Sequence, residues 1–147
     1  MIGVSIVDTE YVVRFCRKST LDDEGSITFG AFLLRRDAAG NALEDYLSVN
    51  CLTKLPGKDM DEQIQVLRTV HPMKLGKRDK FAVLNVGTAR LKIHSEGSSR
   101  RWIRVLAVPL ENNPSHAGIY DTGGQDEVEI AHLLTEAILR SVPAAEV

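Results

Sequence analysis

Residues 101–142 read RWIRVLAVPLENNPSHAGIYDTGGQDEVEIAHLLTEAILRSV, and this stretch decides the fold class of the chain. Its first part, 101–108, is apolar at both sets of alternating positions, which is typical of a strand covered on both faces. Its last part, 126–142, begins with acidic residues and carries apolar side chains at helical spacing on one face. The stretch therefore predicts a buried strand and an amphipathic helix, joined by a polar loop.

The sequence before residue 101 supplies the other expected strands. Runs of β-branched, aromatic or alternating apolar residues predict strands at 11–15, 27–34, 46–50, 80–86 and 88–94. In the segment 88–94 the apolar residues alternate with basic ones, which favours a half-buried strand with a basic outer face. We expect this strand to form a hairpin with 101–108 through a turn at 95–99.

A first helix is predicted at 59–70. Asp59 is placed to cap this helix, and Glu62 three residues later completes a pattern that resembles a capping box. Apolar residues then recur on one helical face at Met60, Ile64 and Leu67. We therefore predict an α+β fold, in which a largely antiparallel mixed β-sheet is packed by two main helices at about 59–70 and 126–142.

Length and composition are those of an ordinary globular protein. The 147 residues suit a single domain spanning 1–147, with a frayed C-terminal tail at about 143–147. No apolar run approaches the roughly 20 residues that span a bilayer, and the first ten residues lack the basic start of a secretory signal. Cys16 and Cys51 have no metal-ligand spacing and suit free thiols. We expect a cytoplasmic protein with no membrane partner, metal or cofactor.

Charge is distributed unevenly along the chain. Segment 74–104 holds nine basic and two acidic residues, whereas 105–147 holds one basic and seven acidic residues. The asymmetry has two interpretations: the basic segment binds an anionic partner, or the two segments face each other in the fold. For the first interpretation, phosphate contacts need clustered basic side chains. The candidate nucleic-acid-binding residues on the expected hairpin are Arg90, Lys92, Arg100, Arg101 and Arg104.

The polar loop at 108–120 is the best place for a functional site, because such loops are held by rigid elements. It contains His116, a candidate acid or base near neutral pH, and the structural alternative is that its ring bonds backbone groups. The triplet that begins at Asp121 matches aspartic proteases, but the helix expected after it favours a simple turn. Neither His71 nor His94 has ligands at metal spacing, and we expect structural or exposed roles for both.

Several short motifs in fixed order resemble a family of small bacterial proteins of unknown function. They are an arginine in the first strand (Arg14), a phenylalanine in the second (Phe32), an LSV strand at 47–49 and an NPxH loop at 113–116. The resemblance carries no activity. It implies that four residues belong together as a ligand-binding set: Arg14, Ser48, Asn113 and His116. If the LSV strand pairs beside the first strand, Arg14 and Ser48 face His116 across one cleft and suit a phosphate or carboxylate group.

The sequence supports three hypotheses about function. The first is a binding or accessory module of the bacterial cytosol that recognises a protein partner or an anionic ligand. The second is an enzyme acting on a nucleotide or RNA, with Arg14 as anion clamp and His116 as acid or base. The third is an antitoxin-like or immunity-type partner protein. The sequence has no known catalytic signature and so favours a non-enzymatic role, and a homodimer is the commonest assembly for such a chain.

Overall fold

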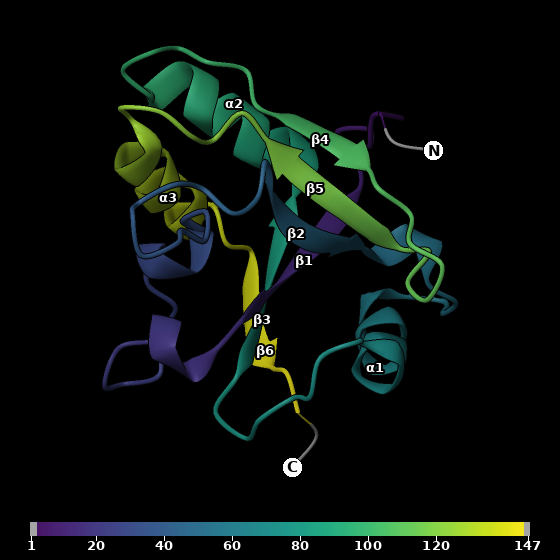
Figure 1. The fold of residues 1–147 in the computed structure, drawn as a ribbon. Coiled ribbons are helices and arrows are strands. Elements are labelled where there is room, and N and C mark those ends of the chain that lie inside the picture. The colour runs from purple at the N-terminus through teal and green to yellow at the C-terminus, as the bar shows by residue number, and fades with distance from the viewer. Residues whose placement is uncertain (1–2, 146–147) are drawn as a thin grey trace.

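The computed structural model describes residues 3–145 and has an α+β fold (Figure 1). Within these residues it contains one six-stranded sheet and three α-helices. The strands are β1 (Tyr11–Cys16), β2 (Tyr46–Cys51), β3 (Lys80–Asn85), β4 (Arg104–Ala107), β5 (His116–Tyr120) and β6 (Arg140–Pro143). The helices are α1 (Met60–Val70), α2 (Val86–Glu96) and α3 (Glu127–Glu136). The predicted fold class is confirmed.

The sheet has the order β4-β5-β2-β1-β3-β6, and every pairing is antiparallel. Strand β1 pairs with β3 along its whole length, but with β2 only through Val12–Cys51 and Val13–Asn50. Beyond Val13 the strands β1 and β2 spread apart (Figure 1). The sheet therefore consists of two three-stranded halves, β4-β5-β2 and β1-β3-β6, which are joined along a short contact that we call the seam.

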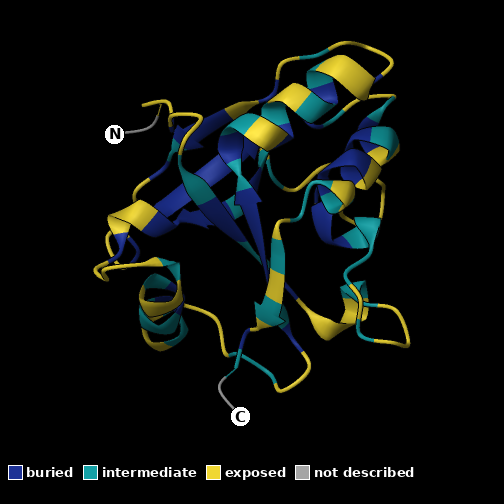
Figure 2. Cartoon of the chain, turned by 180° about the vertical axis from the view of Figure 1, so that it is seen from behind, coloured by how far each residue is buried: buried dark blue, intermediate teal, exposed yellow. Residues whose placement is uncertain are grey.

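Helices cover both faces of the sheet. Alternate residues of the strands point to opposite sides, so each face contributes its own apolar side chains to a core. On β1, Val12 joins the larger hydrophobic core, beneath α2 and α3, whereas Val13 joins a smaller core beneath α1. Figure 2 shows the strands largely buried at the centre and the exposed positions on the outer sides of the helices. The α1 core lies on the β1-β3-β6 half, and it takes Ile64 and Leu67 from the helix.

Helix α1 begins as predicted. The Asp59 carboxylate accepts a hydrogen bond from the Glu62 backbone N–H at 2.9 Å, and the Glu62 side chain accepts one from the Lys58 N–H at 2.9 Å. The first bond satisfies a backbone donor that the first helical turn leaves unpaired, and the second joins Glu62 to the residue before the cap, where a capping box would use the N–H of Asp59. Ile64 and Leu67, two residues of the predicted apolar face, are fully buried. The prediction of this helix from its capping and spacing is confirmed.

The prediction of a strand at 88–94 is wrong, because this segment forms helix α2. The Asn85 side chain accepts a hydrogen bond from the Thr88 N–H and starts the helix. Ala89 and Ile93, four residues apart, are buried, whereas Leu91 between them is 58% exposed. Alternation at three positions fits a helix with one misplaced apolar residue as well as it fits a strand. No hairpin through 95–99 exists, and that turn instead ends the helix.

Two other predicted elements differ from the structure. The segment predicted as a strand at 27–34 contains a short 3₁₀ helix, Phe29–Phe32, whose buried Phe32 packs in the core next to α3. The helix predicted at 126–142 ends at Glu136, and Arg140–Pro143 form β6 at the edge of the sheet. The apolar spacing continues past residue 136 although the helix ends there. Ile138, in the connection to β6, still packs against the core.

The segment expected to be a loop contains strand β5, which starts at His116 and pairs with β2 and β4. The expected turn after this strand is present: Asp121 has a φ of 70°, and Arg101 donates hydrogen bonds to the carbonyls of Asp121 and Gly123. In the tail that we expected to fray, Pro143 lies in β6 and Ala144 is buried, while 146 and 147 lie outside the described residues. None of the helices in 3–145 is long and apolar enough to cross a membrane.

Candidate functional site

A pocket of about 450 Å³ opens where β1 and β2 spread apart at the seam. We call it the seam pocket. Its walls come from β1, β2, the start of β5, the segment after α1 and the loops around residues 30 and 110. The polar residues that line it are Arg14, Arg17, Ser19, Thr20, Arg35, Glu44, Ser48, Asn50, His71, Asn113 and His116.

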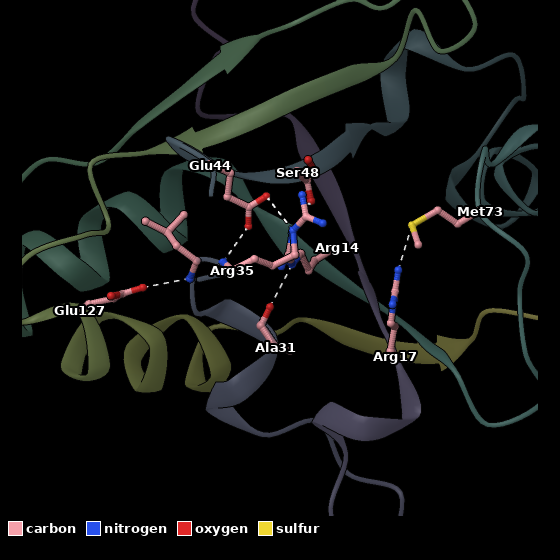
Figure 3. A network of polar contacts seen from close by, with 9 residues as sticks. Arg14, Arg17, Ala31, Arg35, Glu44, Ser48, Met73 and Glu127 are labelled. Atoms are coloured by element: carbon pink, nitrogen blue, oxygen red, sulfur yellow. Dashed lines mark hydrogen bonds and ion pairs between the residues drawn. The ribbon is translucent and has the colours of Figure 1, made fainter. Parts of the chain in front are cut away.

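Arg14 bridges the gap between the two halves of the sheet (Figure 3). Its Nε donates a hydrogen bond to the Ala31 carbonyl at 2.9 Å, and its Nη1 donates one to the Ser48 carbonyl at 2.9 Å. A guanidinium has five N–H donors, so three remain without a partner within residues 3–145. The two carbonyls therefore fix the orientation of the side chain and leave donors available to the pocket.

No carboxylate of residues 3–145 is in direct contact with the charge of Arg14. Burial lowers the pKa of the Arg14 guanidinium, but arginine stays protonated in proteins. No acidic side chain of the described chain lies within 4.0 Å of it. Glu44, the acid that lines the same pocket, forms an ion pair with Arg35 at 3.3 Å. Arg14 is thus a half-buried cation on which Glu44 acts only as a more distant charge, and no carboxylate of the described chain pairs with it directly.

Arg17 adds a second cation to the pocket. Its exposed guanidinium contacts the Met73 sulfur at 3.9 Å, and it has no ion pair within residues 3–145 (Figure 3). Because Arg35 and Glu44 neutralise each other, Arg14 and Arg17 leave the pocket with an excess of positive charge. Such a cavity attracts anions.

His116 is buried at the first position of β5, opposite Asn50 of β2. Its Nδ1 lies 2.8 Å from the Val108 carbonyl oxygen, which can only accept a hydrogen bond. The Nδ1 therefore carries a proton, and in the neutral ring Nε2 keeps a free lone pair. No described residue bonds Nε2. The predicted structural role of the ring, a bond to backbone, is present, and it leaves the other nitrogen available.

The position of the His116 ring depends on Tyr46 and on a glycine. The two rings meet edge to face, with centroids 5.8 Å apart. The Tyr46 ring lies over Gly118, where a Cβ would stand only 2.6 Å from Tyr46 Cδ2. Gly118 is therefore needed because its missing side chain leaves room for the tyrosine that packs against His116.

Two asparagines and a serine form a buried cluster beside His116. Ser115 Oγ lies 2.9 Å from Asn50 Oδ1 and 3.1 Å from Asn113 Oδ1. Both asparagines also line the seam pocket, and the second amide atom of each has no hydrogen-bond partner within residues 3–145. The Ser48 hydroxyl on the same strand face likewise has no partner there. This end of the pocket is polar but uncharged.

One wall of the pocket is aromatic and apolar. Phe15 and His71 pack with ring centroids 5.1 Å apart, and Pro72 and Met73 continue this surface. The Met73 backbone N–H donates to His71 Nδ1 at 3.2 Å in the neutral tautomer with its proton on Nε2, and Nδ1 also lies 3.5 Å from the Met73 carbonyl oxygen. Burial lowers the pKa of His71, which favours this neutral form.

The four residues predicted to bind a ligand, Arg14, Ser48, Asn113 and His116, all line the seam pocket. The strand that contains the LSV residues pairs with β1 through Asn50 and Cys51, whereas residues 47–49 themselves pair with β5. Among the lining residues that were not predicted, three bear on the chemistry of the pocket: Arg17, Asn50 and His71. Asn50 could have been found, because it lies two residues after Ser48 and so on the same strand face. For Arg17 and His71 the sequence gives no signal, because only the path of the chain brings them to the pocket.

The five basic residues predicted to bind nucleic acid lie elsewhere and share no hairpin. Four of them form ion pairs: Arg90 with Asp8, Lys92 with Glu96 and Glu136, Arg101 with Asp126, and Arg104 with Asp121. Arg100 stands in the turn after α2 with a φ of 52°. Three of the pairs join the basic segment 74–104 to the acidic segment 105–147. The interpretation that these two segments face each other in the fold therefore describes much of this region.

Among residues 3–145, no group of three or more His, Cys, Asp or Glu side chains is arranged to hold a metal ion. Comparisons with protein-family models, with curated protein sequences and with solved structures find no match to this chain. The chemistry of the pocket itself is therefore the basis for a functional proposal.

Proposed function

We propose that this chain is a binding module for a small anionic ligand, with a phosphate or carboxylate group held in the seam pocket. The observation that carries the proposal is the Arg14 guanidinium, which is half-buried, oriented by two carbonyls and in no ion pair within the described chain. Removing a charge from water is costly unless an opposite charge accompanies it. A bound anion supplies that charge.

The geometry of the pocket suits a group with several oxygen acceptors. Arg14 is held in place before a ligand arrives, so few rotamers need to be fixed on binding. Its free N–H donors match the oxygens of phosphate or carboxylate, and such charge-assisted bonds are stronger than neutral ones. Arg17 adds charge from the rim of the pocket.

Titration with inorganic phosphate, followed by NMR chemical shifts and calorimetry, tests the proposal. We expect weak binding to the wild type, and about tenfold weaker binding to Arg17→Gln, because one charge-assisted contact of roughly 1.4 kcal/mol is lost. The control variant Arg78→Gln removes the same charge from an exposed residue outside the pocket and leaves the affinity unchanged. If phosphate and acetate at about 10 mM cause no shifts at Arg14 or His116, the proposal is refuted.

A second candidate function is acid–base chemistry on the bound ligand by His116. It is favoured by the bond between Nδ1 and the Val108 carbonyl, which fixes the tautomer and leaves Nε2 as the free base in the same pocket as Arg14. Incubation with a panel of phosphate esters tests it. Hydrolysis by the wild type that is lost in His116→Asn supports the role, whereas hydrolysis that persists in that variant excludes His116 as the base.

A further inference from the structure

The seam pocket has two chemically different ends. Arg14 and Arg17 give one end its positive charge, whereas the other end presents the neutral amides of Asn50 and Asn113. Both asparagines are more than nine-tenths buried, with exposed fractions of 6% and 5%. Buried amides normally use all their hydrogen-bonding atoms. Each of these has one amide atom without a protein partner in residues 3–145, and that atom is open to water or to a ligand in the pocket.

The hydrogen bonds within the cluster determine which donors and acceptors the two amides present to the pocket. Ser115 Oγ carries one proton, so it donates to only one of the two asparagines. The other amide is best satisfied when it turns and donates its own N–H to Ser115 Oγ. One amide then presents an N–H donor to the pocket, and the other presents a carbonyl acceptor. Together they match a planar ligand edge that has a donor next to an acceptor.

The strand geometry sets the separation between the two ends. Arg14 Nη1 is bonded to the Ser48 carbonyl, and Asn50 follows two residues later on β2, which is about 7 Å along a strand. His116 stands opposite Asn50 and brings its free Nε2 to the same end. A ligand that uses both ends therefore carries its anionic group several ångströms from its polar planar edge.

The aromatic wall of the pocket is suited to a flat ring. Phe15, His71 and Met73 provide aromatic and thioether surface. Aromatic side chains stack well on nucleobases, whichever base is present. The volume of about 450 Å³ lies within the range of small-molecule sites, which is roughly 300–1,000 Å³.

We infer that the seam pocket takes a nucleoside monophosphate, with the phosphate on Arg14 and Arg17 and the base edge on Asn50 and Asn113. The inference rests on the proposed anion-binding function and adds the class of ligand. Every nucleobase has an edge on which a hydrogen-bond donor lies next to an acceptor. Inorganic phosphate fills only the charged end, and a free nucleoside fills only the neutral end.

The test compares ligands that reach one end or both. Calorimetry measures the affinities for inorganic phosphate, ribose 5-phosphate, adenosine and the four common nucleoside monophosphates. We expect at least one nucleoside monophosphate to bind about tenfold or more tightly than ribose 5-phosphate, because two amide bonds are added. Asn113→Ala should weaken nucleotide binding and leave ribose 5-phosphate binding unchanged. Asn112→Ala is the matched control, because Asn112 is exposed and does not line the pocket.

The outcomes separate this inference from the proposed function. If ribose 5-phosphate and all four nucleotides bind equally, the base-recognition inference fails and anion binding stands. If adenosine binds as tightly as its monophosphate and Arg17→Gln changes neither affinity, the anion site fails. If none of the ligands binds, both fail. Should Asn113→Ala not fold by circular dichroism, the ligand series on the wild type alone decides.

Discussion

Glu127 connects helix α3 to the segment that supports Arg14, and its replacement by glutamine gives a sharp prediction about stability. One carboxylate oxygen accepts a hydrogen bond from the buried Leu34 N–H at 2.9 Å, and the other forms an ion pair with Arg36. Leu34 lies three residues after Ala31, whose carbonyl holds Arg14. In Glu127→Gln, one amide oxygen can still accept from Leu34, but the amide N–H₂ then faces the guanidinium of Arg36.

The expected loss is about 1.5–2 kcal/mol of unfolding free energy. A hydrogen bond to a charged group contributes about 1.5–3 kcal/mol. The low end applies because the Arg36 side chain is 43% exposed and recovers water when its partner is gone, whereas the Glu127 side chain is only 8% exposed. For a chain of this length the melting temperature falls by roughly 2–4 °C for each kcal/mol, so a decrease of about 3–8 °C is expected.

Urea unfolding followed by circular dichroism measures this loss, and Glu129→Gln is the matched control. Glu129 occupies the same first turn of α3, so it shares the interaction with the helix dipole, but its carboxylate accepts hydrogen bonds from the exposed Ser98. We expect the control to lose less than about 1 kcal/mol. Equal losses in the two variants would show that burial and the Leu34 bond do not determine the contribution of Glu127.

Three further results are expected. Burial raises the pKa of Cys16 to about 12 and also raises that of Cys51, so neither thiol should react with a thiol reagent at about pH 8 until the protein unfolds. In Gly118→Ala the new methyl group meets the Tyr46 ring, and urea unfolding should show a loss of about 1–3 kcal/mol; an unchanged midpoint would contradict the close packing. Burial lowers the pKa of His71, so the folded protein resists a proton that the unfolded chain accepts, and stability falls below about pH 6.5. His71→Gln should flatten melting temperatures measured between about pH 7 and 5, and an equal slope in both proteins would contradict this.

The parts of the fold that could be predicted are those whose local signals agree. Helix α1 has a cap, a capping partner and one apolar face, and each of these is present in the structure. Helix α2 was missed because Ala89 and Ile93 also alternate with basic residues, and so the short pattern fits two periodicities. Strand β6 was missed because its residues continue the apolar spacing of α3, and only pairing with β3 decides their conformation.

The grouping of the four candidate residues was predicted better than the elements that carry them. Arg14, Ser48, Asn113 and His116 were grouped through the order of short motifs, and they line one pocket although the strand expected at 27–34 is absent. The grouping survives because it depends on the pairing of β1 with β2, which both have clear strand signals. The unpaired charge of Arg14 could not be foreseen, because it depends on Glu44 being engaged by Arg35.

The short seam has a consequence for the order in which this protein folds. The chain alternates between the two halves of the sheet, since β1, β3 and β6 belong to one half and β2, β4 and β5 to the other. Neither half is a continuous piece of sequence, so neither can form early from local contacts alone. The contacts that build the pocket join residues 34 and 65 positions apart, and such long loops close slowly. If refolding is followed through ligand binding, the binding signal is therefore expected only once the strand topology is complete, after the helices have formed.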